Sequence, residues 1–416
     1  MTIRDESQRK STGTPGYGQG PSVGAPAVPT PQPRRTIGRF QYFALGFGSI
    51  IGSAWVVVLG DWLAAAGPLG ACLAFLAGGV LMCLLAAVYA ELSSRMPEAG
   101  GGFIFAYRVF GVRAGFFVGW FVTLHLAAVA AFEAIVLPWM LQVLFPELKG
   151  PALYTLMGEQ ITLDAVVLGA AGVLLMTFLN YRDVRLAVRF QSVVTYGFLA
   201  VAVVALAMAS ATGSAANIAP LFASGGVSPW WIGAAWIFAN TAFFLNGFQA
   251  IPQAIEESAP GVSAQTIARV MIASVVIAVL FYCAALLSAS MATPWQQLAG
   301  VPLATAVAVE HVLPNGLLSR VILLAAAFSL LKTWNSVVLI AARVVMAQAR
   351  IGLLPETLGR LHPRHATPAA AVLFLGFFSL AGMLLGRGAV LPLVNMASIC
   401  LAFTFVLACV GALKLR

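Results

Sequence analysis

Long runs of apolar residues dominate the chain from about residue 38 onward. Each run is about 20 residues or more, which is the length that a helix needs to cross a bilayer. The pattern predicts an all-α membrane protein with about ten spans. The spans are expected near residues 40–65, 69–93, 114–145, 161–180, 190–211, 230–256, 266–292, 317–346, 368–386 and 389–413.

Two of these stretches are interrupted in the middle by glycine and polar residues. The first span contains Gly48-Ser-Ile-Ile-Gly-Ser53, and the sixth contains Phe244-Leu-Asn-Gly-Phe248. Unwound backbone at membrane depth persists only where it is buried in protein or lines a cavity. Corresponding breaks in two halves of a chain indicate a substrate site between inverted repeats, so the pattern predicts a transporter. The alternative is that Gly48 and Gly52 only let helices pack closely.

The composition supports a membrane protein, because 61% of the residues are hydrophobic and only 9% are charged. Residues 1–38 differ, being rich in Pro, Gly, Ser and Thr. They cannot bury enough apolar surface to fold alone, and we expect a disordered cytoplasmic tail followed by a transmembrane core over 39–416. His125, His311, His362 and His365 are scattered, and the five cysteines all lie within predicted spans. We therefore expect no enzyme activity, no cofactor and no metal site.

The net charge of +9 is a topology signal, and we expect no nucleic-acid partner. With the N-terminus inside, only Lys149, Arg320 and Arg387 among the loop cations fall outside. This asymmetry predicts a multi-pass protein of the cell (inner) membrane with a cytoplasmic N-terminus. The residues on the cytoplasmic side are then Arg34, Arg35, Arg39, Arg95, Arg108, Arg113, Arg182, Arg185, Arg189, Arg269, Arg343, Arg350, Arg360, Arg364, Lys414 and Arg416.

Five local patterns resemble the amino acid–polyamine–organocation transporter superfamily, in that family's order and spacing. They are Gly48 to Ala54, Tyr89 to Gly102, Asn180 to Gln191, Gly247 to Pro260 and Ala341 to Pro355. The resemblance implies the five-plus-five inverted repeat of the leucine-transporter-like fold, with broken helices one and six. Repeat one would cover about 39–211 and repeat two about 229–416. The implied function is secondary active transport of amino acids or related amines by alternating access in a bacterium.

The resemblance also implies a substrate site at the two breaks. The free amides around Ser53 and Ala54 would hold a carboxylate at the positive end of a half-helix. The unwound ends at Ile50, Phe243 and Asn246 present carbonyls that suit an ammonium group. Phe243 would be an aromatic gate, with ordinary packing as the alternative. The full expected set is Ile50, Gly52, Ser53, Ala54, Phe243, Asn246 and Gly247.

Ala54 and Trp55 stand where the family more often has glycine followed by an aliphatic residue. The larger side chains predict an anion pocket that is tighter than usual.

Lys332 lies near the middle of the eighth span, where an uncompensated charge costs roughly 2.5–3.5 kcal/mol. In sodium-coupled members of the broader fold, hydroxyls near this place help to bind a cation against the first break, and the resemblance puts Lys332 and Thr333 there. Our hypothesis is that the Lys332 ammonium replaces the sodium ion and that its deprotonation couples transport to protons. Burial disfavours the charged form of lysine, which makes this role feasible. The alternative is that Lys332 forms a structural pair with Glu133 or extends its ammonium group toward the membrane surface.

Two further side chains are candidates for coupling or gating. Glu133, inside the third span, would meet a cationic part of the substrate, pair with Lys332 or accept a proton, and these roles stay open. Gln249 stands where relatives often carry a carboxylate, and an amide does not titrate. Glu256 and Glu257 are candidates for an inner gate with arginines such as Arg95 or Arg189, and a solvated acidic helix end is the alternative.

The sequence contains no nucleotide-binding motif, so energy is expected from a proton gradient, a sodium gradient or a counter-substrate. An amino acid/amine exchanger is one alternative, and a non-transporting membrane sensor or assembly subunit on the same fold is another. The expected partners are a small-molecule substrate, protons or a counter-substrate, and the lipid bilayer. The sequence leaves open whether the protein forms a homo-oligomer.

Overall fold

The computed structural model describes residues 35–98, 100–148, 150–224, 229–301, 303–310 and 317–416. Most of the predicted tail, residues 1–34, lies outside the described residues, and so do Lys149 and His311.

The described chain is almost entirely helical. Its α-helices are α1 (Arg39–Ile50), α2 (Ala54–Val57), α3 (Leu59–Arg95), α4 (Gly102–Phe110), α5 (Val112–Leu144), α6 (Leu163–Arg182), α7 (Val184–Thr212), α8 (Trp230–Phe244), α9 (Ala250–Gln253), α10 (Ala264–Ala292), α11 (Ala304–Glu310), α12 (Leu317–Arg350), α13 (Glu356–Gly359), α14 (Ala369–Met383) and α15 (Val390–Lys414). Short 3-10 helices are η1 (Ala215–Ile218), η2 (Ile255–Glu257), η3 (Trp295–Gln297) and η4 (Arg387–Ala389). Strands β1 (Ala152–Leu156) and β2 (Glu159–Thr162) form an antiparallel hairpin.

Eight segments of the described chain are long and apolar enough to cross a membrane. One of them, α3, consists of two helices that meet at Gly67, where φ is 73° and ψ is 174°. A side chain there would also clash, because a Cβ would lie 2.6 Å from the amide nitrogen of Ala223. The first predicted span is therefore α1, α2 and the start of α3, and the second is the remainder of α3.

The two remaining predicted spans are shorter in the structure. The sixth is α8, which ends at Phe244 and continues through turns into α9. The ninth is α14, an apolar helix of 15 residues. The β-hairpin between the third and fourth spans was not predicted.

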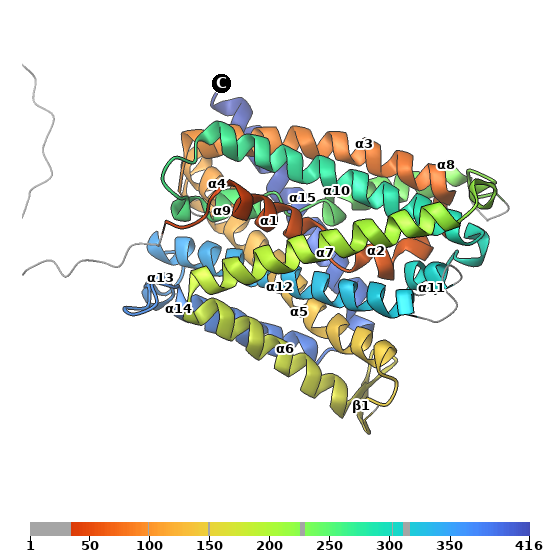
Figure 1. Ribbon diagram of the computed structural model, residues 1–416. Coiled ribbons are helices and arrows are strands. Elements are labelled where there is room, and N and C mark those ends of the chain that lie inside the picture. Colours follow the sequence, from red (N-terminus) through yellow and green to blue (C-terminus); the bar gives the residue numbers. More distant parts are fainter. Residues whose placement is uncertain (1–34, 99, 149, 225–228, 302, 311–316) are drawn as a thin grey trace, which may run out of the picture.

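The helices run between two ends of the molecule (Figure 1). We call the end with α4, α13 and the C-terminus the terminal end, and the end with α11 and β1 the hairpin end. The short helices α4 and α11 follow the second and seventh spans and lie at opposite ends (Figure 1). Equivalent elements at opposite ends are what an inverted repeat requires.

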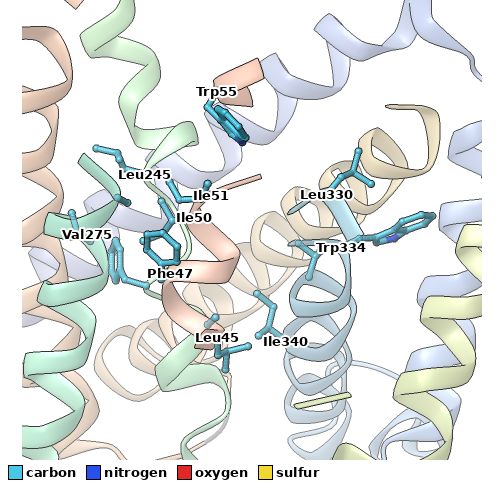
Figure 2. Packing of buried hydrophobic residues seen from close by; sticks show 14 of the residues in the cluster. Leu45, Phe47, Ile50, Ile51, Trp55, Leu245, Val275, Leu330, Trp334 and Ile340 are labelled. Carbon is cyan, nitrogen blue, oxygen red and sulfur yellow. The ribbon is translucent and has the colours of Figure 1, made fainter. Parts of the chain in front are cut away.

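Helix α1 lies at the centre, in contact with α7, α10 and α12. All residues from Ala44 to Ile50 are buried, as Figure 2 illustrates for Leu45, Phe47 and Ile50. A Cβ at position 48 would lie 2.3 Å from Gln191 Nε2 and 2.6 Å from Thr195 Oγ1 on α7. Gly48 therefore allows close helix packing. The chain is also unwound between Ile50 and Ala54, so the alternative that Gly48 and Gly52 serve packing alone is wrong.

The last residues of the predicted tail are held against the core. The backbone amides of Thr36 and Ile37 donate to the carbonyl oxygen of Glu257, both at 2.9 Å, and Ile37 is fully buried. The Arg35 Nε donates to the carbonyl oxygen of Ser258 at 3.0 Å. Residues 35–38 thus belong to the ordered core rather than to a free tail.

Candidate functional site

The first break separates α1 from α2. The last helical bond of α1 runs from the amide of Ile51 to the carbonyl of Phe47 (3.0 Å). The next runs from the amide of Val56 to the carbonyl of Ser53 (3.0 Å). The amides of Ser53 and Ala54 precede that bond, so no helical carbonyl stands behind them. They are groups of the kind that bind an anion.

The second break separates α8 from α9 and touches the first. Helix α8 ends where the amide of Leu245 donates to the carbonyl of Thr241 (2.8 Å). A Cβ at position 247 would lie 2.5 Å from the amide nitrogen of Ile50 and 2.7 Å from the carbonyl carbon of Ser49. The two backbones meet because residue 247 is glycine.

Side chains of α12 donate hydrogen bonds to the backbone carbonyl oxygens of the first break. Lys332 is fully buried, and its Nζ donates to the carbonyl oxygens of Gly48 (3.1 Å) and Ile51. Ser329 Oγ lies 2.9 Å from the carbonyl oxygens of both Ile51 and Gly52, and Thr333 Oγ1 lies 3.1 Å from that of Gly48. An ammonium group thus sits where the hypothesis places a sodium substitute.

The Phe198 ring lies behind this ammonium, 4.8 Å from Lys332 Nζ to the ring centroid. A cation over an aromatic face is attracted by the ring quadrupole, which offsets part of the cost of burying the charge. The contact joins α12 to α7.

A cavity of about 450 Å³ opens beside the two breaks. Its size is that of a small-molecule site. Ten of the eleven predicted site residues line it, and Lys332 lies behind the wall. The ten are Ile50, Gly52, Ser53, Ala54, Glu133, Phe243, Asn246, Gly247, Gln249 and Thr333.

Glu133 is 3% exposed and lines the cavity. A Cβ at Gly52 would lie 3.9 Å from Glu133 Oε1, so the carboxylate faces the first break. Its Oε2 has no hydrogen-bond partner among the described residues. The charges of Glu133 and Lys332 interact, but the hydrogen bonds of Lys332 go to backbone carbonyls.

His125 and Asn246 form a second polar pair on the wall. The His125 Nδ1 lies 3.0 Å from the carbonyl oxygen of Ala397, and its Nε2 lies 3.0 Å from Asn246 Nδ2. A carbonyl only accepts, so Nδ1 carries the proton and Nε2 accepts from the amide group. The Asn246 Oδ1 is left buried and without a partner among the described residues.

Several residues that line the cavity were not predicted, because the sequence does not determine which face of each helix points toward the cavity. They include His125, whose polar side chain inside a span was the available signal. Other missed wall residues with polar or aromatic side chains include Asp61, Trp139, Asn240, Tyr282 and Asn395. Of the two residues expected to tighten the anion pocket, Ala54 lines the cavity and Trp55 does not. Its ring packs against Phe281 and Phe198, away from the cavity wall (5.4 and 5.8 Å between centroids), and Figure 2 shows it beyond the break.

Two ion pairs lie on the terminal side of the second break. Glu257 pairs with Arg343, both nearly fully buried, and its Oε1 accepts from Arg343 Nε at 2.7 Å. Glu256 pairs with Arg350 at 3.1 Å near the surface. The partners expected from the sequence were wrong, since Arg95 instead pairs with Glu91.

Tyr42 joins α1 to the same place. Its hydroxyl lies 2.6 Å from Ser258 Oγ and donates to the carbonyl of Ala254 at 3.1 Å. Together with the Glu257 pair, this contact ties η2 to α1 and α12. The cavity instead extends toward the hairpin end, where Asp61, Trp139 and Gly300 line it.

This arrangement defines a multi-pass membrane transporter. The structure is similar to that of Mhp1, a nucleobase-cation-symport-1 family transporter, in a closed conformation with bromovinylhydantoin bound. The TM-score is 0.62 at 14% identity, over 93% of this chain and 81% of that one. At this identity the likeness concerns the fold alone, and it confirms the predicted leucine-transporter-like fold.

The sequence profile of the amino acid permeases matches residues 37–416, so the chain belongs to this family. The predicted membership of the amino acid–polyamine–organocation superfamily is confirmed. The branched-chain amino acid permease BcaP of Bacillus subtilis (strain 168) is 28% identical over 92% of this chain and 81% of its own length. The methylthioribose transporter of the same organism is 26% identical over 89% and 79%. The Asc-type amino acid transporter 1 of Homo sapiens is 26% identical over 82% and 64%.

Proposed function

We propose that this protein is a secondary active transporter that moves an amino acid or a related amine by alternating access, coupled to protons. The observation that carries the proposal is the buried Lys332 ammonium on the carbonyls of Gly48 and Ile51. Two relatives are named for amino acids and one for methylthioribose, which supports a small polar substrate without fixing its identity.

The substrate would lie in the cavity beside the two breaks. The amides of Ser53 and Ala54 are the groups for a substrate carboxylate, because they have no helical partner. Phe243 lines the cavity next to Phe244, at 5.5 Å between ring centroids, and is the proposed aromatic gate. Gln249 would contact the substrate as a hydrogen-bonding group, since an amide carries no proton for coupling.

The proton would act through Lys332. In its charged form the ammonium donates two charge-assisted hydrogen bonds that tie α12 to the first break. Loss of the proton removes the charge and weakens both bonds, so the first break can move relative to α12. Thr333 holds the same carbonyl of Gly48 and would keep the break in register while the lysine is neutral.

The proposed location is the cell membrane, with the terminal end in the cytoplasm. Helices α3, α4 and α6 each have an arginine in their last turn, and these turns lie at the terminal end of the molecule. An excess of Arg and Lys on one side is typical of the cytoplasmic face. The cavity, which extends toward the hairpin end, would then face outward in this structure.

The test is uptake of a pooled mixture of radiolabelled amino acids and amines into proteoliposomes with an alkaline interior. We expect accumulation that disappears without the pH gradient and that an inward sodium gradient at equal pH does not restore. Equal uptake with sodium would contradict proton coupling. Exchange in preloaded vesicles without accumulation would indicate an exchanger, and failure of both would favour the sensor or assembly subunit.

Lys332→Met is the first variant to measure, since it keeps the aliphatic length and removes the charge. We expect at least a tenfold loss of gradient-driven accumulation. Lys414→Met is the matched control, because Lys414 is exposed at the C-terminal end of α15, where its Nζ donates to the carbonyl of Val109 and lies 5.1 Å from the centroid of the Phe110 ring. Full proton-driven uptake by a Lys332→Met protein that elutes as a single species would refute the coupling role.

A further inference from the structure

The cavity wall contains two buried oxygen atoms without hydrogen-bond partners among the described residues, Glu133 Oε2 and Asn246 Oδ1. Buried polar atoms in native proteins nearly always have a partner, so each needs an explanation. Both are acceptors, and a ligand that satisfies them must bring N–H or O–H donors. The carbonyls of Ile51, Gly48 and Gly52 are not equivalent alternatives, because α12 already occupies them.

The orientation of Asn246 is fixed by its neighbour rather than by the ligand. The Ala397 carbonyl requires a proton on His125 Nδ1, which leaves Nε2 as an acceptor for the Asn246 amide hydrogen. The opposite orientation would set Oδ1 against the lone pair of Nε2. His125 is thus a positioning residue that leaves the Asn246 carbonyl oxygen free for a donor.

The charged side chains that line the cavity are negative. Among the described residues that line the cavity, Asp61 and Glu133 are acidic, and no lysine or arginine is present. Lys332 lies behind the wall, with its donors on two backbone carbonyls. Low-dielectric walls with one sign of charge concentrate ligands of the opposite sign. Because the hydrogen bonds of Lys332 go to backbone carbonyls, a cationic ligand would give the buried Glu133 carboxylate a counter-charge bonded directly to it.

Glu133 and His125, the residue that holds Asn246, lie at different levels of α5. Residues 125 and 133 are eight positions apart on α5, which corresponds to about 12 Å along the helix axis. The apolar side chains of Val129, Phe132 and Val136, on the same helix, also line the cavity. This arrangement fits an elongated ligand with an aliphatic middle and donors at both ends.

We propose, on the basis of the transport function above, that the substrate is an elongated alkylammonium compound with net positive charge. An amino acid with an aliphatic cationic side chain fits this description. Glu133 binds one ammonium group, and Asn246, held by His125, accepts from the donor at the other end.

The test compares competitors of equal carbon skeleton in counterflow with radiolabelled L-lysine and, separately, L-norleucine. Norleucine has the four-carbon side chain of lysine without its ammonium group. We expect lysine to compete at least about tenfold better, the factor that a hydrogen bond to a charged group typically provides. Equal or better competition by norleucine would overturn the proposal. Counterflow of norleucine without that of lysine would do so while leaving the transport function intact, whereas no counterflow of any labelled compound would refute both.

Glu133→Gln tests whether Glu133 causes the preference for a positively charged substrate. The ratio of norleucine to lysine half-inhibitory concentrations should fall to within about threefold of unity, because the amide keeps the volume and loses the charge. Glu159→Gln, on the exposed β2 strand, should leave the ratio unchanged. An unchanged ratio in a folded Glu133→Gln protein would show that Glu133 does not bind the ammonium.

His125→Phe tests the positioning role. It should raise the KM for lysine about tenfold or more with Vmax within about twofold, because only the orientation of Asn246 is lost. His362→Phe, in the loop before α14, is the control and should change neither. A His125→Phe protein with unchanged KM would contradict the role of His125.

Discussion

At the scale of single residues, Gly247 shows how the site depends on the absence of a side chain. Its backbone touches Ile50 and Ser49 of the first break. We predict that Gly247→Ala pushes the two breaks apart, abolishes substrate binding and destabilises the protein by about 1–3 kcal/mol, as overpacking does. Thermal unfolding in detergent and counterflow would measure the two effects.

Gly197→Ala is the matched control for that substitution. Gly197 lies inside α7, and a Cβ at this position would meet no neighbouring side chain or helix within 4 Å. Alanine there should be neutral or stabilising by about 0.5–1 kcal/mol, the usual gain of alanine over glycine in a helix. Equal loss of counterflow in both variants would contradict the packing argument.

The sequence identified the residues whose chemistry is unusual for their depth. Lys332 and Glu133 stood out because charged side chains inside spans are costly. The sequence did not identify Arg343 as the partner of Glu257, because the two residues are 86 positions apart and meet only through helix packing. The sequence also did not predict that Asn246 Oδ1 lacks a hydrogen-bond partner. The orientation of this side chain is set by His125, which in turn is held by the carbonyl of Ala397 in α15.

At the scale of elements, the contacts of η2 with α1 and α12 would form the gate on the terminal side. The side chains of Arg343 and Glu257 are 4% and 6% exposed, whereas those of Arg350 and Glu256 are 36% and 27% exposed. Removing one partner of a buried pair typically costs about 3–5 kcal/mol, and a surface pair is worth about 0–1 kcal/mol. The two pairs therefore predict very different effects.

We predict that Arg343→Gln opens the terminal side and that Arg350→Gln does not. The measurement is labelling of Ser258→Cys by a membrane-impermeant maleimide, in a background without the five native cysteines. Ser258 is buried, so labelling should be slow in the parent and at least about tenfold faster with Arg343→Gln. Similar labelling rates in both arginine variants would refute the gate.

Element types followed from the sequence more closely than element ends. Apolar length alone located the membrane helices, and Pro68 after Gly67 marks the kink that divides α3. The β-hairpin was missed because its strands are short and β1 is exposed along its whole length, so no buried alternation marks it. The break between α8 and α9 was predicted from Phe244-Leu-Asn-Gly-Phe248, whereas its contact with the first break, at Gly247, is seen only in the structure.

At the scale of the whole molecule, the two ends should face different compartments. We predict that Thr155→Cys, on the exposed β1 strand, is labelled in intact cells by an impermeant maleimide. Arg364→Cys, in the loop between α13 and α14, should react only after the membrane is opened. The reverse pattern would show that the terminal end lies outside and that the proposed orientation is wrong.

If the protein is a proton-coupled transporter, substrate and proton cross the membrane together. The most direct measurement records the internal pH of proteoliposomes with a trapped pH dye while radiolabelled substrate is added outside, with the membrane potential clamped and no pH gradient imposed. We expect the lumen to acidify as label enters, and Lys332→Met to abolish this acidification. Entry of label into vesicles of wild-type protein without any acidification would refute proton coupling.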